Sequence, residues 1–272
     1  MILLLSIVIP VYNESEQRVL ATLSSCSNSY KDEVEYIIVD SSEVTVFHAV
    51  HVACTVGISS NLVKIIKSHP TGIYSACNLG VQAANGRFIA FMNVGDSYCK
   101  DAINLFLEFQ KAYHGLLSRP IIFFGGSILV NRFSQHLLTH QLASPRTLLR
   151  KLTITDLVFY PPCHQAIFAE SSLFRKRLPF DHEFFPVCAD RKFMLEAYRS
   201  GAAFIRLPFD VCLYEIGGYS FRNSIQLLDD IYSLSCLYLS LPFRVIAFCM
   251  ILKYRLASNV RRLVHSIFYV SD

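Results

Sequence analysis

The chain has 272 residues, of which 53% are hydrophobic, and its formal net charge at pH 7 is +4. This length suits one large α/β domain with an appendage and is sufficient to bury a sizeable core. The small net charge argues against a nucleic-acid binder driven by phosphate contacts. A mean hydropathy of +0.38 favours a membrane surface or a protein partner instead.

Nine cysteines are scattered along the sequence without a C-x-x-C pair, which argues against a disulfide framework and a structural zinc site. Reduced thiols and a cytoplasmic location are therefore expected. The amino terminus MILLLSIVIP has neither a basic leader nor a small-residue cleavage site, and its apolar run is too short to span a bilayer. We interpret it as the first strand.

The first expected elements are a strand and a helix. Residues 3–9 form an apolar strand that Pro10 should stop. Asn13 can cap the following helix, with Glu16 three residues later. The helix should bury a stripe made of Val19, Leu20, Leu23 and Cys26.

A second strand is predicted over residues 35–39, and it ends in Asp40, Ser41 and Ser42. Residues 43–60 fit a helix or a strand, since their β-branched content leaves both open. Residues 62–66 look like a third strand.

Residues 71–98 predict a helix, a buried strand and an acidic turn in succession. Small residues should let the helix lie close to a sheet, with Gly86 as a left-handed stop. The helical face consists of Ala76, Leu79, Gly80 and Ala83.

The apolar run 88–92 that follows predicts a strand covered on both faces, and it ends in Asn93, Val94, Gly95 and Asp96. Asp40 and Asp96 should therefore meet at one sheet edge, where open α/β sheets bind ligands. Taken singly, either acid could cap a helix or close a turn.

The second half of the chain mixes helices with short strands. Helices are expected over 101–113, within 144–159 and over 189–200, where Gly201 should end the helix, and strands over 120–130, 133–142, 164–168, 203–207 and 211–215. The strands 120–130 and 133–142 can pair as a hairpin.

From Ser220 onwards two helical stretches are expected, divided near Pro242. Residues 236–252 are nearly apolar but contain Pro242 and Arg244, which argues against a spanning helix. An interfacial helix pair fits better, with membrane contact through 236–265. The alternative is packing on the rest of the protein or on a second subunit. Basic residues follow at Lys253, Arg255, Arg261 and Arg262.

Several motifs in order resemble one family over residues 3–218. SIVIPVYNE, IIVDSS, TGIYSACNLGVQAANGRFIAFMNVGDSY, CHQAIF and CADRKFMLEAYRSG together look like the bacterial family-two inverting glycosyltransferases of the GT-A fold. The resemblance implies an α/β fold, a Rossmann-like mixed sheet flanked by helices. It also implies a GT-A domain over 1–218, with a nucleotide-binding half (1–98) and an acceptor half (99–218), and a C-terminal helical extension over 219–272.

The implied reaction is inverting transfer of a sugar from a nucleoside-diphosphate sugar, UDP-linked by expectation. The acceptor would be a glycan or lipid-linked molecule in cell-surface polysaccharide synthesis, at the cytoplasmic face of the membrane. Asp40 would bond the base or ribose of the donor. The other residues expected at the donor are Pro10, Tyr12, Glu14, Asn78 and Asn93.

Asp96 matches the metal-binding acid of the family, which implies Mg²⁺ or Mn²⁺ as cofactor. The family often has Asp where this chain has Asn93 or Gly95. One carboxylate with substrate phosphates can still hold a hard divalent ion, so weak, substrate-assisted metal binding is expected.

Asp190 matches the catalytic base, although an acid at a helix start is also a common cap. The next two residues, Arg191 and Lys192, depart from the family pattern. Their positive charges would favour the ionised form of Asp190 and weaken it as a base unless the side chains point away. The resemblance also implies Arg191 at the acceptor or diphosphate. His164 and Gln165 match a pair near the diphosphate or acceptor, but a lone histidine there is more often structural. Gly218 resembles a flexible segment near the site or an ordinary hinge.

The sequence disfavours two other classes of enzyme and leaves one non-enzymatic alternative open. A nucleotidyltransferase would need a glycine-rich loop after the first strand, and PVYNESEQ has no glycine. A dinucleotide-binding enzyme is also unlikely, because no G-x-G-x-x-G fingerprint follows a predicted strand in this sequence. A catalytically degenerate member that binds a nucleotide sugar or a partner stays open, because carboxylates are missing at 93 and 95.

Overall fold

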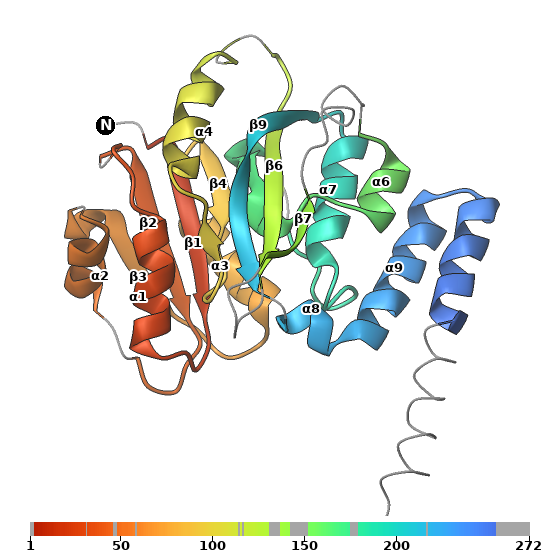
Figure 1. The fold of residues 1–272 in the computed structure, drawn as a ribbon, viewed down its shortest axis with the longest axis horizontal. Coiled ribbons are helices and arrows are strands. Elements are labelled where there is room, and N and C mark those ends of the chain that lie inside the picture. The colour runs from red at the N-terminus through yellow and green to blue at the C-terminus, as the bar shows by residue number, and fades with distance from the viewer. Residues whose placement is uncertain are drawn as a thin grey trace, which may run out of the picture.

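The computed structural model describes residues 3–30, 32–45, 48–57, 59–113, 115, 117–130, 137–141, 152–174, 179–215 and 217–253. Within these residues, nine strands form one sheet in the order β3-β2-β1-β4-β8-β6-β9-β5, and β7 pairs with β6 (Figure 1).

The first half of the sheet is parallel and buried. It consists of β1 (Leu5–Val11), β2 (Val34–Asp40), β3 (Val63–Lys67) and β4 (Phe88–Phe91). Every residue of β1, β2 and β4 is buried, as continuous apolar runs predict.

The prediction that Pro10 stops the first strand is wrong, because β1 continues to Val11. Val11 turns its carbonyl towards β2, where it accepts from Ser41 N, so the neighbouring Pro10 faces the β4 side. Because β4 ends at Phe91, it has no strand residue opposite Pro10, and the missing N–H of the proline costs the sheet no hydrogen bond between β1 and β4.

The second half makes the sheet mixed. It contains β5 (Ser97–Tyr98), β6 (Ile121–Val130), β7 (Leu137–Gln141), β8 (Ile167–Glu170) and β9 (Ala203–Glu215). β8 is antiparallel to β4 and β6, whereas β6 and β9 are parallel. The predicted hairpin is confirmed by the β6–β7 pairing. The two short strands expected over 203–215 are instead the single strand β9.

Helices cover both faces of the sheet. One face carries α1 (Glu16–Ser25), α2 (Ala49–Val56) and α4 (Ala102–Lys111), and the other carries α3 (Ile73–Ala83), α6 (Ile154–Phe159), α7 (Ala189–Arg199) and α9 (Ser224–Tyr238). The ambiguous stretch 43–60 thus contains a helix. Four short helical turns are η1 (Ser60–Leu62), η2 (His164–Ala166), η3 (Ser171–Leu173) and α8 (Tyr219–Arg222).

Small residues bring α3 close to the sheet, as predicted. A Cβ at Gly80 would lie 2.3 Å from Cγ1 of Val8 in β1. The expected left-handed stop at Gly86 is wrong, because α3 ends at Ala83 and Gly86 has no positive φ. Glycine is needed there for close approach, since a Cβ would lie 2.6 Å from the backbone nitrogen of Ser6.

The cap of α1 also differs from the prediction. Ser15 is the N-cap, and its hydroxyl accepts from Arg18 N at 3.4 Å. Asn13 instead takes a left-handed conformation with φ of 50° and donates its N–H to Ser42 Oγ. The loop after β1 is therefore joined to the loop after β2.

α9 packs into the main body. Leu234 is fully buried, and Asp230 Oδ2 accepts from the backbone nitrogens of Val187 at 2.9 Å and Cys188 at 3.0 Å. α9 therefore packs on residues that precede 218, and the predicted boundary there stays a prediction.

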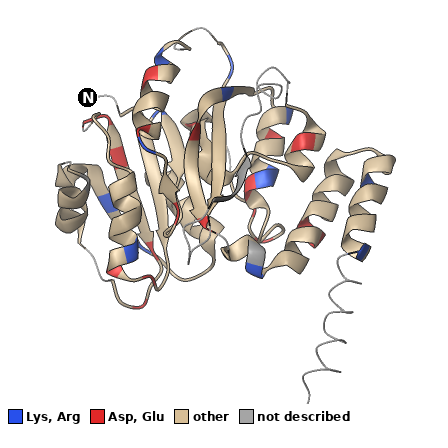
Figure 2. Ribbon diagram, in the orientation of Figure 1, with Lys and Arg blue, Asp and Glu red and all other residues tan. Residues whose placement is uncertain are grey.

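A further helix spans 241–253, with Pro242 in its first turn. Of its residues only Ala247 and Ile251 are buried, and its two charged residues, Arg244 and Lys253, are basic (Figure 2). The remaining part of the predicted membrane segment, 254–265, lies outside the described residues. None of the helices in the described ranges has the length and apolar character needed to cross a membrane.

Candidate functional site

The candidate site lies at the carboxyl ends of β1, β2 and β4. The chain runs outward from β1 to β2 and β3, and then returns to the other side of β1 as β4. This reversal is the switch point at which open sheets bind ligands. Asp40 ends β2, and Asp96 lies in the turn after β4.

Asp40 is fully buried and well supplied with donors. Its carboxylate accepts from Ser42 N at 2.9 Å, from the Thr45 hydroxyl and from Lys67 Nζ at 3.1 Å. Burial alone would raise its pKa, but the donors outweigh burial and hold the pKa below its usual range. Asp40 is thus charged and organises the loop that follows β2.

Asp96 sits in a less compensated environment. Oδ1 accepts from the backbone nitrogen of Glu215 at 2.9 Å, and Oδ2 accepts from Gln165 Nε2 at 2.7 Å. Thr22 fixes the turn, because its hydroxyl donates to Asp96 O and accepts from Gly95 N, each at 3.0 Å. Burial raises the pKa of Asp96 to about 6 despite these bonds.

Asp190 lies in the first turn of α7, and one of its oxygens is held. Oδ1 accepts from the Tyr74 hydroxyl at 2.8 Å and from Arg191 N at 2.9 Å. Oδ2 forms no hydrogen bond with any residue that the structure describes. The carboxylate is therefore oriented by one oxygen and can accept a proton through the other.

His164 and Gln165 connect the two acids. Gln165 bonds Asp96, while the buried His164 ring lies 6.2 Å from the Tyr74 ring and within electrostatic reach of Asp190. Burial lowers the pKa of His164, and its Nε2 is buried without a partner among the described residues. Asp96 thus contacts η2 directly through Gln165, and Asp190 is near it through Tyr74, whose ring lies beside His164.

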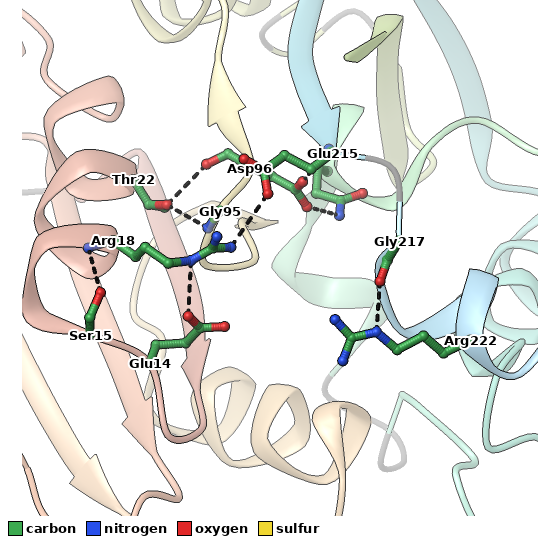
Figure 3. Close-up of polar contacts among 10 residues, drawn as sticks. Glu14, Ser15, Arg18, Thr22, Gly95, Asp96, Glu215, Gly217 and Arg222 are labelled. Atoms are coloured by element: carbon green, nitrogen blue, oxygen red, sulfur yellow. Dashed lines mark hydrogen bonds and ion pairs between the residues drawn. The ribbon is translucent and has the colours of Figure 1, made fainter. Parts of the chain in front are cut away.

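A guanidinium joins the loop after β1 to the acidic turn. Arg18 Nε lies 2.9 Å from Glu14 Oε2, and its second terminal nitrogen lies 3.4 Å from Glu215 Oε2. Figure 3 shows Arg18 extending from α1 to the Gly95–Asp96 turn, with the end of β9 on the other side.

Two predicted residues have internal roles. Asn78 is only 3% exposed, and both ends of its amide bond the backbone of Phe180, so its assignment to the donor is corrected to a structural one. The Arg191 guanidinium donates to Val158 O at 2.7 Å. Lys192 pairs with Asp181 and Glu196. The side chains of both cations therefore pair with groups other than Asp190.

The remaining predicted residues border the same region. Tyr12 is 58% exposed in the loop after β1, beside the buried Pro10. Asn93 Oδ1 is buried without a partner among the described residues. Gly218 precedes α8 and follows Gly217, whose φ is 92°.

The acidic turn offers one carboxylate, that of Asp96, to a divalent ion. No group of three or more His, Cys, Asp or Glu side chains in the described ranges could hold a metal. Asp96 is ionised above its pKa of about 6, and each of its oxygens has a second lone pair. Mg²⁺ and Mn²⁺ are held by one or two carboxylates with substrate phosphates and waters, so the turn fits a substrate-assisted ion.

Sequence reasoning missed three residues of this region, Arg18, Tyr74 and Glu215. Glu215 ends the strand predicted over 211–215, so the rule that located Asp40 and Asp96 would also have found it. Arg18 stands four residues after Glu14, the spacing of a helical ion pair. Tyr74 gives no local signal, because its partner lies 116 residues away.

Comparison with known proteins places this geometry in a family. A model described as glycosyl transferase family 2 matches residues 6–174. An uncharacterized glycosyltransferase of Rickettsia conorii is 27% identical over 114 residues, which cover 42% of this chain and 18% of the relative. The matched region is thus less than one fifth of that relative's length.

Structures of S. aureus TarS are among the solved structures that share this fold. TarS 1–349 matches with a TM-score of 0.61 and 14% identity, covering 99% of this chain and 76% of that chain. Its complex with UDP matches with a TM-score of 0.61 and 16% identity, covering 92% and 71%. A longer TarS chain matches at 0.60 and 15% identity, and 43% of it is covered.

At these identities the likeness to TarS concerns the fold, and it confirms the predicted GT-A-type α/β architecture. The family match covers more than half of the chain and includes the loop after β1, Asp40, the acidic turn and the His164–Gln165 pair. On this evidence, the chain belongs to glycosyl transferase family 2.

Proposed function

We propose that the protein transfers a sugar with inversion from a UDP-linked sugar to a hydroxyl of a glycan or lipid-linked acceptor, in cell-surface polysaccharide synthesis. The observation that carries the proposal is the placement of both acids around η2: Gln165 donates to Asp96, and the adjoining His164 ring lies 6.2 Å from the ring of Tyr74, whose hydroxyl donates to Asp190. Family membership supports sugar transfer, and TarS structures with UDP and UDP-GlcNAc support a uridine donor.

Asp190 is the general base of the proposed reaction. The acceptor hydroxyl must lose its proton as the new bond forms, and a base on the face opposite the leaving group gives inversion. Tyr74 and the backbone of Arg191 hold Oδ1, so Oδ2 takes the proton.

Asp96 serves the leaving group. Mg²⁺ or Mn²⁺ held by Asp96 would supply Lewis-acid stabilisation of the departing diphosphate. Gln165 and the backbone of Glu215 orient the Asp96 carboxylate, and at neutral pH that carboxylate is charged because its pKa is about 6. Asp40, Tyr12 and Glu14 line the nucleoside end of the donor.

A thermal-shift panel of nucleotide sugars, with Mn²⁺ or with EDTA, tests the donor class, because a ligand that binds only the native state raises the melting temperature. A UDP-sugar should give the largest shift, and Mn²⁺ should increase it. No shift with any nucleotide sugar contradicts the proposal. Activity that EDTA does not diminish contradicts the assignment of a divalent ion to Asp96.

Asp190→Asn tests the base. We expect the UDP-sugar shift to persist while transfer and slow donor hydrolysis fall by at least about 100-fold, the size of a general-base contribution. Asp101→Asn is the matched control, because Asp101 also begins a helix and is exposed. Loss of binding together with turnover would make Asp190 a structural acid. Binding without hydrolysis in the unaltered protein would favour the degenerate member.

A further inference from the structure

A cation that the proposed reaction does not use lies against the acidic turn. Arg18 comes from α1, and its guanidinium lies against Gly95, next to Asp96 (Figure 3). Its attraction is one of the effects that lower the pKa of Asp96. A fixed positive charge therefore stands at the carboxyl end of β4, beside the acid assigned to the diphosphate.

Two features of the structure favour glycine at position 95. Gly95 has a φ of 100°, which L side chains rarely adopt. A Cβ there would also lie 2.0 Å from a terminal nitrogen of Arg18, so the guanidinium would have to move to admit a side chain. The guanidinium thus fills the space that an acidic side chain at 95 would use.

Two carboxylates fix the guanidinium while part of it stays accessible. Glu14 pairs with Nε at 2.9 Å, and Glu215 pairs with one terminal nitrogen at 3.4 Å. The other terminal nitrogen has no hydrogen bond or ion pair with a described residue, and the side chain is 26% exposed. Arginine held in this way keeps two N–H donors for an oxyanion at little entropic cost.

We propose that Arg18 is a donor-binding residue that contacts the diphosphate of the nucleotide sugar through its free terminal nitrogen. This inference rests on the proposed function. Glu14 and Glu215 already pair with the guanidinium, so Arg18 does not replace the divalent ion. The turn offers only one carboxylate to a metal ion, and the Arg18 guanidinium supplies a second, permanent positive charge for the diphosphate.

The test compares uridine with UDP in calorimetric titrations, in EDTA and in Mn²⁺. Arg18→Met keeps the aliphatic part of the side chain and removes the charge. We expect UDP to bind about 10- to 100-fold more weakly, the range for losing hydrogen bonds to a charged group, with the larger loss in EDTA. Uridine should change less than about 2-fold, because it has no phosphate.

Two further variants separate the causes. Arg18→Lys keeps the charge without the planar fork and should give an intermediate loss. Arg199→Met is the control, since Arg199 lies at the end of α7 over the Tyr238 ring, 4.5 Å from its centroid. It should leave both affinities unchanged.

The outcomes distinguish this inference from the function beneath it. Unchanged UDP affinity in Arg18→Met overturns the role of Arg18 alone. Equal losses for uridine and UDP also overturn it, because they indicate a role in shaping the loop. If the unaltered protein binds UDP in neither EDTA nor Mn²⁺, the proposal of a uridine-linked donor is wrong, and the proposed contact of Arg18 with its diphosphate is wrong as well.

Discussion

Three aspartates of the candidate site differ because their immediate neighbours differ. Asp40 is buried but has enough donors to stay charged, whereas Asp96 is buried with fewer and has a pKa of about 6. Asp190 is partly exposed and held by one oxygen. A single sequence signal, an acid after a strand or at a helix start, thus leads to three distinct environments.

Tyr74 is expected to act as a positioning residue for Asp190. Its hydroxyl lies 2.8 Å from Asp190 Oδ1 and 3.0 Å from Val187 O, and the ring is buried. Tyr74→Phe keeps the ring and removes the hydroxyl, so we expect kcat to fall about 10-fold, the worth of one such hydrogen bond, with the donor KM unchanged.

Steady-state kinetics with a melting curve for each variant check this expectation. Tyr160→Phe is the control, because Tyr160 is 81% exposed and removal of its hydroxyl should change neither constant. A Tyr74→Phe enzyme with normal kcat would show that Arg191 N alone orients the base.

At this scale the sequence predicts residues that follow a local rule. Asp96 and the adjoining Gln165 were both predicted for the site, and they are in contact. Tyr74 and Asp190 meet only because α3 and α7 lie on the same face of the sheet. Such a contact depends on the complete topology, so no spacing along the chain reveals it.

At the scale of elements, Glu35 joins three strands and the end of a helix. This β2 residue accepts from Ser6 Oγ of β1 at 2.6 Å, from Lys64 Nζ of β3 at 2.7 Å and from Asn85 N after α3 at 2.6 Å. Burial alone would raise its pKa, but these three donors outweigh burial and lower it.

A pH-dependent stability follows from this arrangement. A carboxyl whose pKa is lower in the folded state stabilises the fold at pH values above its unfolded pKa, and the contribution is lost as pH falls through the folded pKa. Glu35→Gln should therefore cost about 1.5–3 kcal/mol at pH 7 and flatten the loss of stability below about pH 4.3.

Urea unfolding of both proteins from pH 7 to pH 3 measures the difference. Glu33→Gln, one position before β2, is the control and should follow the unaltered protein at every pH. Parallel pH curves for Glu35→Gln and the unaltered protein would contradict the assignment.

Element types were largely predictable, while element ends were not. The buried runs of β1, β2 and β4 and the stripe of α1 follow from hydrophobic pattern. The end of β1 was missed because the tolerance of Pro10 depends on where β4 stops. The identity of α2 was open, since packing of Val52 and Ala53 into the core decides it.

For the whole molecule, the C-terminal helices divide into a packed part and an exposed part. α9 belongs to the core through Leu234 and Asp230, so a chain ending near Gly218 would uncover apolar surface. In helix 241–253 the exposed apolar side chains include Leu241, Val245, Ile246, Phe248, Met250 and Leu252. Contact with a membrane surface therefore stays a prediction, centred on this helix and not on α9.

Binding to vesicles that contain anionic lipid tests it in the full chain. Val245→Glu with Met250→Glu places two acids on exposed positions and should reduce co-sedimentation by at least about 10-fold, from lost apolar burial and charge repulsion. Val50→Glu on α2, where the valine is 65% exposed, should have no effect. Equal sedimentation of all three proteins would favour a protein partner for the helix.

The tight fit of Arg18 against Gly95 also restricts how this sequence can diverge. Any side chain at 95 meets the guanidinium in its present position, so a lineage that acquires aspartate there must move the arginine away from the turn or replace it. Relatives should accordingly show correlated replacement, with arginine at the first site accompanying glycine at the second. Aspartate at 95 should coincide more often with a smaller residue at 18.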